Sequence, residues 1–195
     1  VFGKIDLSTP VVANATPVVE YTLLDGLKDK FNWIYALTYS GLLAFYIVLF
    51  TFYPKAGIVQ AKQVILFGII GAIVGMIYSN KSSKRIPVLR LGGLIQVIAA
   101  FGLSFAGDNQ LMATISAACL GFFMFLPMPA LVTYAQERAN MTAQKISVTF
   151  SLFWSISYTV ATIIPTIFAK LVDMHTGDYH TAFVFICIVE GSFFV

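Results

Sequence analysis

One stretch near the end of the sequence carries hydroxyl side chains at the spacing of a helix. Five residues follow one another at intervals of 4, 4, 3 and 4: Ser147, Ser151, Ser155, Tyr158 and Thr162. A helix places residues at these intervals along one face, where hydroxyl groups donate and accept hydrogen bonds. Such a stripe suits either a small polar solute or hydrogen bonds between helices, and the sequence leaves both interpretations open.

Large aromatic side chains accompany this stripe and recur in an earlier apolar segment. Trp154 combines one N–H donor with a flat apolar surface, which suits a small ligand as well as lipid. Earlier in the chain, four tyrosines lie at intervals of 4, 7 and 7, beginning at Tyr35 and ending at Tyr53. These outer two lie near the ends of the segment, where aromatic belts form. The inner two, Tyr39 and Tyr46, are therefore the better candidates for a solute pathway.

The segments that must position these residues are long and apolar. Four runs lack Asp, Glu, Lys and Arg, namely residues 32–54, 63–80, 109–136 and 146–169, and a fifth covers 91–107. About 20 apolar residues in a helix cross the ~30 Å hydrocarbon core of a bilayer. The chain is 58% hydrophobic and 11% charged, whereas a soluble domain is about half apolar and about a quarter charged. We therefore predict a polytopic membrane protein.

The same runs predict an all-α membrane fold. Only helices and closed barrels satisfy the backbone hydrogen bonds inside a bilayer, and these runs lack the alternation of barrel strands. Six spans are predicted, the last of them incomplete: residues 32–53, 63–79, 86–106, 109–136, 146–171 and 181–195. The chain begins at Val1 and stops inside an apolar run, so we expect it to be a fragment of a longer protein.

The distribution of Lys and Arg predicts the orientation. With residues 1–30 as a cytoplasmic linker, that side of the membrane carries nine of the twelve Lys and Arg residues and the other side three, as the positive-inside rule requires. Within the linker, Leu23, Leu24 and Leu27 would share one face of a short interfacial helix. Residues 31–195 form the predicted six-helix transmembrane bundle of a multi-pass protein, which we place in the cell membrane.

One acidic residue is expected inside the membrane. Glu190 follows His180 by ten residues, which is about 15 Å along a helix. A carboxylate at that depth costs about 2.5–3.5 kcal/mol on insertion scales and is a functional hypothesis by default. Glu190 is therefore a candidate for proton coupling.

No arrangement typical of an enzyme is present in the sequence. No nucleophile lies beside a base, and we find no phosphate-binding loop and no cluster at metal-ligand spacing. Cys119 and Cys187 lie in apolar runs, where thiols usually behave as small buried hydrophobes. We expect no enzymatic activity, no cofactor, no metal and no nucleic-acid partner.

The turn between the second and third predicted spans resembles a transporter motif. It is short and basic, and the span before it contains three glycines that permit another helix to approach closely. In the major facilitator superfamily this turn resembles G-x-x-x-D-R-x-G-R-R. Gly75 and Lys84 match its first and last positions, whereas Ser79 and Asn80 replace its Asp and Arg. The resemblance implies a conformational-gating loop that includes Gly75, Ser79, Lys84 and Arg85.

A second resemblance covers residues 31–195. This region is similar to the C-terminal half of the cyanate and 2-nitroimidazole transporter branch of that superfamily, in which a Gly-Tyr pair within the fifth helix is followed seven residues later by a Gly-Pro pair. Tyr158 and Pro165 keep this interval, with Ser157 and Ile164 in place of the glycines. The Phe-Tyr pair at 45–46 and the Tyr-Pro pair at 53–54 also resemble the branch.

The resemblance implies the C-terminal six-helix half of a secondary transporter. It would work by alternating access together with an N-terminal six-helix half that this chain lacks. In that fold the first, second, fourth and fifth helices of a half face the cavity or the partner half, while the third and sixth lie outside. This implies a pathway for a small polar or anionic solute lined by Tyr39, Tyr46, Ser151, Trp154 and Tyr158.

An integral membrane subunit with a structural or assembly role is the alternative. Such a subunit needs no polar pathway, and its hydroxyl and aromatic residues need not meet. A transporter half should instead bring Tyr39, Tyr46, Ser151 and Tyr158 toward one surface. The positions of these four side chains therefore distinguish the two interpretations.

Overall fold

The computed structural model of the chain describes residues 21–194. Helices make up 82% of the structure, and no strand occurs in this described part. The predicted all-α fold is confirmed. The part of the linker prediction that falls on residues 1–20 lies outside the described residues.

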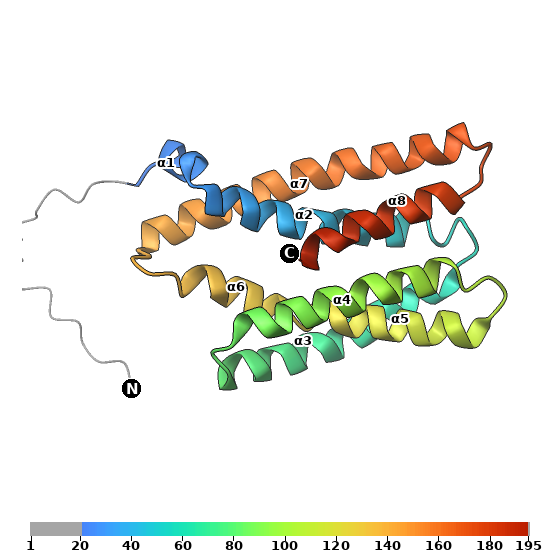
Figure 1. The fold of residues 1–195 in the computed structure, drawn as a ribbon, viewed down its shortest axis with the longest axis horizontal. Coiled ribbons are helices and arrows are strands. Elements are labelled where there is room, and N and C mark those ends of the chain that lie inside the picture. Colours follow the sequence, from blue (N-terminus) through green and yellow to red (C-terminus); the bar gives the residue numbers. More distant parts are fainter. Residues whose placement is uncertain (1–20, 195) are drawn as a thin grey trace, which may run out of the picture.

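Five helical segments are long and apolar enough to cross a membrane, and Figure 1 shows them running along one common direction. They are α2 (Lys30–Thr51), α3 (Gln63–Lys81, preceded by η1, Val59–Lys62), α4 (Arg85–Ser104), α5 with α6 (Gln110–Phe125 and Met128–Gln136) and α7 (Ala143–Met174). The shorter helix α8 (His180–Glu190) and the turn η2 (Gly191–Phe194) follow. The chain is a multi-pass membrane protein, and each of the six predicted spans has a helical counterpart.

The outer surface of the bundle is apolar, as contact with lipid requires. α3 buries only five of its residues against the rest of the chain. Its outward side chains include Leu66, which is 65% exposed, and Ile69, which is 55% exposed. Soluble monomers rarely leave apolar surface of this extent uncovered. Lipid is the solvent for this face.

Close packing of α3 on α5 depends on glycine. A Cβ atom at Gly71 would collide with the carbonyl oxygen of Phe122, and one at Gly121 would collide with the carbonyl oxygen of Val64. A Cβ atom at Gly75 would likewise meet the carbonyl of Leu126, where α5 ends. Small residues let membrane helices approach until their backbones touch. The predicted close approach at the glycines of α3 is confirmed.

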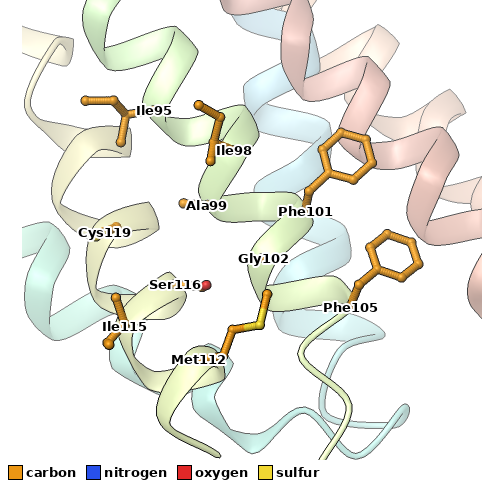
Figure 2. A pocket seen from close by; sticks show the side chains of 10 residues that line it. All are labelled: Ile95, Ile98, Ala99, Phe101, Gly102, Phe105, Met112, Ile115, Ser116 and Cys119. Carbon is orange, nitrogen blue, oxygen red and sulfur yellow. The ribbon is translucent and has the colours of Figure 1, made fainter. Parts of the chain in front are cut away.

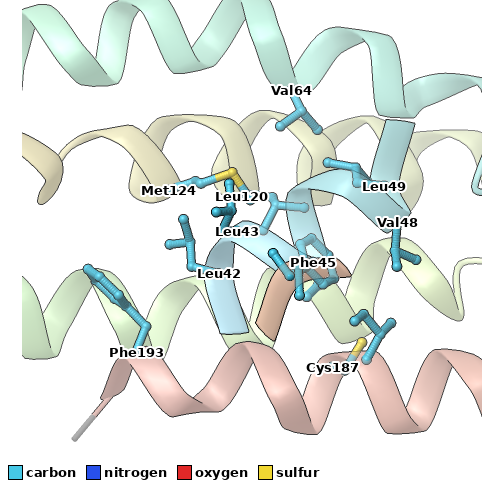
Figure 3. Packing of buried hydrophobic residues seen from close by; sticks show 14 of the residues in the cluster. Leu42, Leu43, Phe45, Val48, Leu49, Val64, Leu120, Met124, Cys187 and Phe193 are labelled. Carbon is cyan, nitrogen blue, oxygen red and sulfur yellow. The ribbon is translucent and has the colours of Figure 1, made fainter. Parts of the chain in front are cut away.

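A single buried cluster connects α2 to both sides of the bundle. α2 packs extensively on α7, and it also contacts α8 and η2. Figure 3 shows α2 side chains between those of α5 and those of the C-terminal segment; the labelled members are Leu42, Leu43, Phe45, Val48, Leu49, Val64, Leu120, Met124, Cys187 and Phe193. The two cysteines are free, and Cys187 is buried. The first span is thus the centre of the packing.

The fourth predicted span is divided into two helices. α5 ends at Phe125 and α6 begins at Met128, with Pro127 as the residue before it and Pro129 in its first turn. Proline lacks an amide hydrogen and is tolerated at the first turn of a helix. These two prolines therefore lie at a helix boundary. Pro165, by contrast, lies inside α7, which continues to Met174.

The connections between helices gather at the two ends of the bundle. Figure 1 shows α1, the α3–α4 turn and the α6–α7 turn at one end, with the remaining turns at the other. Eight basic residues lie at or near the first end: Lys28, Lys30, Lys81, Lys84, Arg85, Arg90, Arg138 and Lys145. The short helix α1 (Leu23–Lys28) is present, and it leaves Leu23 and Leu24 exposed. Its position at a membrane interface, like the cytoplasmic side itself, stays a prediction.

Candidate functional site

The candidate site begins with an aromatic cluster that joins α2 to α7. The ring of Tyr39 meets the edge of Trp154 at a centroid distance of 5.7 Å, and Trp154 stacks on Tyr158 at 5.7 Å. Phe153, the residue before Trp154, also stacks on Tyr39, at a centroid distance of 4.9 Å. Three of the five predicted pathway residues therefore lie together. Phe153 was not predicted, because nothing in the sequence distinguishes it from other phenylalanines of the apolar runs.

The hydroxyl stripe of α7 lies on an exposed face of the chain. Trp154 is 41% exposed and Tyr158 is 56% exposed, and the five stripe residues Ser147, Ser151, Ser155, Tyr158 and Thr162 are all exposed. Tyr39 contributes from beneath this face and is itself buried. Among the described residues, no hydroxyl group of the stripe makes a hydrogen bond to another helix.

Hydrogen bonding between α2 and α7 comes from a different serine. Ser157 is fully buried, and its hydroxyl donates to the carbonyl oxygen of Ala36 at 3.2 Å. On the exposed side, Thr162 donates to the backbone carbonyl of Tyr158, one turn earlier in its own helix. The interhelical role that the sequence offered for the stripe thus belongs to Ser157. Sequence reasoning placed Ser157 only as a replacement for a family glycine.

A groove of about 180 Å³ extends the cluster toward α5 and α6. Tyr39 and Tyr46 line it from α2, and it is completed by Leu42, Leu43, Met124, Phe125 and Met128. The ring of Tyr46 meets the edge of Phe125 at 6.2 Å. Tyr39 therefore belongs both to this groove and to the aromatic cluster. The two methionines, Met124 and Met128, flank the break between α5 and α6. Their position beside Pro127 is the sequence feature from which they could have been predicted.

The chemistry of the cluster and groove is that of uncharged donors on apolar walls. Among the described residues, the hydroxyl groups of Tyr39, Tyr46 and Tyr158 have no hydrogen-bond partner. The residues that line the groove include no charged side chain. Hydroxyl and indole donors on apolar walls suit small neutral solutes or anions.

A second candidate site lies at the end of the bundle that carries the basic turns. Arg85, the first residue of α4, donates to both carboxylate oxygens of Glu137 at 2.7 and 3.1 Å. Its third nitrogen donates to the backbone carbonyl of Ser79 at 2.6 Å, and the Ser79 hydroxyl lies 3.3 Å from that of Thr133 on α6. The Arg85 side chain holds the pKa of the Glu137 carboxyl below its usual range. The α3–α4 turn is thereby tied to the end of α6.

Two of the four predicted gating residues, Ser79 and Arg85, take part in this network. Gly75 packs on the carbonyl of Leu126, while Ser79 and Arg85 contact α6 and its end. The side chain of Lys84 is exposed and makes no hydrogen bond or ion pair with the described residues. The partners Thr133, on α6, and Glu137, directly after it, were not predicted, because their separation of more than fifty residues from Ser79 and Arg85 leaves no local pattern.

Glu190 lies apart from both groups of residues. It is the last residue of α8, it is fully buried, and α8 packs on α2 and α4. An outer groove of about 510 Å³ between α4 and α5 is equally separate (Figure 2). Its lining is almost entirely apolar and includes Ile95, Ile98, Phe101 and Ile115. We interpret this groove as a lipid-facing surface.

Within residues 21–194, no three His, Cys, Asp or Glu side chains lie close enough to hold a metal ion. The chain was also compared with protein-family models, curated proteins and solved structures. No family model, curated protein or solved structure matches it.

Proposed function

We propose that this chain is one half of a secondary transporter of the major facilitator type, which moves a small polar or anionic solute by alternating access. The observation that carries the proposal is the meeting of Tyr39, Trp154 and Tyr158 beside the groove of Tyr46. These residues come from the first and fifth membrane helices. A scaffold has no need to collect its few polar aromatic side chains on one surface.

The exposure of the α7 stripe supports a missing partner half. Hydroxyl and indole groups that face hydrocarbon leave hydrogen bonds unmade, so such a face is normally covered by protein or water. In this chain Ser151, Trp154 and Tyr158 are exposed. A second six-helix half opposite α7 would enclose them in a central cavity, where they act as the solute-binding wall.

The network around Arg85 supports a gate at the basic end. Alternating access requires contacts at one end of the protein that form in one state and break in the other. The Arg85–Glu137 pair is exposed on the Glu137 side and joins two different helices. We assign it, with Gly75 and Ser79, the role of stabilising one state of the α3–α4 turn; Lys84 would contribute a contact to the partner half.

Removal of a single hydroxyl tests the solute-binding wall. The full-length protein in detergent is first screened with small neutral and anionic solutes for ligand-dependent thermal stabilisation. This stabilisation rises with the ratio of ligand concentration to Kd. Tyr158→Phe should then weaken the bound solute by about 0.5–1.5 kcal/mol, which corresponds to about 2- to 13-fold in Kd. Tyr179→Phe is the matched control, because Tyr179 stacks on Phe183 near the far end of α7.

A higher Kd in Tyr158→Phe, with the Kd of Tyr179→Phe unchanged, would support the solute-binding wall. Unchanged affinity in Tyr158→Phe, and also in Trp154→Phe and Ser151→Ala, would show that the stripe does not contact solute. Failure of every solute to stabilise the protein, together with burial of Tyr158 against another subunit, would favour the structural role instead.

A further inference from the structure

The carboxyl group of Glu190 has an environment unlike that of any other acidic residue described in the chain. Glu190 is 0% exposed, and neither of its oxygens has a hydrogen-bond partner among residues 21–194. An ionised carboxylate without a partner is strongly disfavoured in such surroundings, whereas the neutral acid is tolerated. Since the chain itself covers both oxygens, a group from another subunit reaches them only if the helices move.

A second buried polar side chain lies at the same level of the bundle. Gln96 on α4 is also 0% exposed, and both atoms of its amide lack partners among the described residues. The next residue, Val97, packs against Gly191, since a Cβ atom at Gly191 would lie 3.8 Å from Cγ2 of Val97. Gly191 directly follows Glu190. An amide and a carboxyl group, both unpaired, therefore flank one contact between α4 and η2.

A series of hydroxyl and thiol groups begins one helical turn before Glu190, without a hydrogen bond to its carboxyl group, and leads to Ser104 at the end of α4. Cys187 precedes Glu190 by one helical turn, and its sulfur lies 3.4 Å from the hydroxyl of Ser104. That hydroxyl lies 2.6 Å from the hydroxyl of Tyr53. All three side chains are buried. Hydroxyl and thiol groups both donate and accept hydrogen bonds, so they are able to pass a proton along such a chain.

The series of thiol and hydroxyl groups ends at a polar pocket of about 360 Å³. Ser104 lines this pocket together with Asp108, Gln60 and Gln110. Its wall includes exposed residues of two turns, Gly57 and Gly107 among them. The pocket therefore gives water access to Ser104 from the end of the bundle opposite the basic turns.

We propose that Glu190 and Gln96 form a proton-binding site inside the helix bundle, supplied from the Asp108 pocket through Ser104 and Cys187. Ser104 takes up a proton from water in the pocket and gives its own hydroxyl proton to Cys187, and the thiol proton of Cys187 passes to the carboxylate, so that both relay groups end with as many protons as they began with. The two side chains make no hydrogen bond to each other in this structure, so the Gln96 amide would have to move toward Glu190 to donate to the ionised carboxylate. Use of this proton to drive solute transport rests on the proposed function; the site itself does not.

Few other titratable groups face Glu190. They are Tyr53, from the end of α2, and Cys187, from its own helix. α4 contributes the uncharged Gln96 and Ser104, and Arg90 of the same helix lines a groove with Phe31 and Tyr134 near the other end of the bundle. A titration of the buried site is therefore a titration of Glu190.

Infrared difference spectroscopy of the full-length protein in liposomes tests this site without any solute. A pH increase should reduce the C=O stretching band of a buried carboxylic acid, and Glu190→Gln should abolish that band. Asp173→Asn is the control, because Asp173 is exposed on α7, outside the proposed site and route, and its loss should leave the band unchanged. Persistence of the band at full intensity in Glu190→Gln would overturn the proposal.

Two further variants test the neighbours of Glu190. Gln96→Leu removes the amide while it keeps an apolar side chain, and it should shift the pH at which the band changes. Ser104→Ala should keep the band but slow its change after a pH jump. A pH response identical to the wild type in Gln96→Leu, or an equally fast response in Ser104→Ala, would contradict the assigned site or its route. Because no solute is used, these results do not depend on whether the protein transports one.

Discussion

Substitution of Gly71 by Ala should weaken the contact between α3 and α5. The added Cβ atom would collide with the backbone carbonyl of Phe122, which has no rotamer to move away, so the two helices must separate. Overpacking of this kind costs about 1–3 kcal/mol, whereas Ala exceeds Gly in helix propensity by about 1 kcal/mol. We expect a net loss of about 1 kcal/mol in the free energy of unfolding. Gly71→Ala combined with Gly121→Ala should lose about 2 kcal/mol, since each adds one collision.

Equilibrium unfolding of the full-length protein by SDS in mixed micelles measures this loss. Gly191→Ala is the matched control, because its Cβ atom would make only an ordinary contact of 3.8 Å with Val97. It should leave the free energy of unfolding unchanged or slightly raised. Equal losses in Gly71→Ala and Gly191→Ala, or a gain in stability at Gly71, would refute the close contact between the helix backbones.

Three other predictions concern the gate, the topology and the partner half. Arg85 lowers the pKa of Glu137 in the folded protein. The pair should therefore stabilise the fold above the ordinary carboxyl pKa of about 4.3 and lose this effect as the pH falls through the lower pKa of the folded state. The thermal unfolding of Glu137→Gln should lack that dependence on acid. In intact cells, His175→Cys and Lys81→Cys should be labelled from opposite sides of the membrane, and labelling from one side would contradict the topology. Residues 1–195 alone in liposomes should take up no more solute than empty liposomes, and uptake above that control would remove the need for a partner half.

The helices could be predicted from the sequence because lipid imposes a simple rule on them. Long apolar runs had to become helices, and each of the six predicted spans has a helical counterpart. Pro127 and Pro129 marked the point at which the fourth span divides. Glycine spacing predicted the surface of α3 that approaches another helix, although not that α5 would be the helix it meets.

The contacts of the site could be predicted only in part. Helical spacing placed Ser151, Trp154 and Tyr158 on one face of α7, but spacing alone does not say which way a face points. The exposure of that face depends on which side of α7 packs against α2, and this is decided by Phe153 and Ser157.

Pairs of residues far apart in the chain were beyond sequence reasoning for a different reason. The contact of Arg85 with Glu137 depends on how α4 and α6 are placed by all the other helices. The lack of partners at Glu190 is likewise a property of the whole packed core. A local pattern identifies the acid as unusual but says nothing about what surrounds it.

Access of water to the α7 stripe tests the central proposal most directly. Tyr158→Cys in the full-length protein should react with a membrane-impermeant thiol reagent, because a transport pathway is filled with water. Ile163→Cys should stay unreactive, since Ile163 is 54% exposed but lies about 140° around the helix, on the side that we assign to lipid. The wild-type chain, with Cys119 and Cys187, gives the background. Protection of Tyr158→Cys to the same degree as Ile163→Cys would contradict a solute pathway along this face.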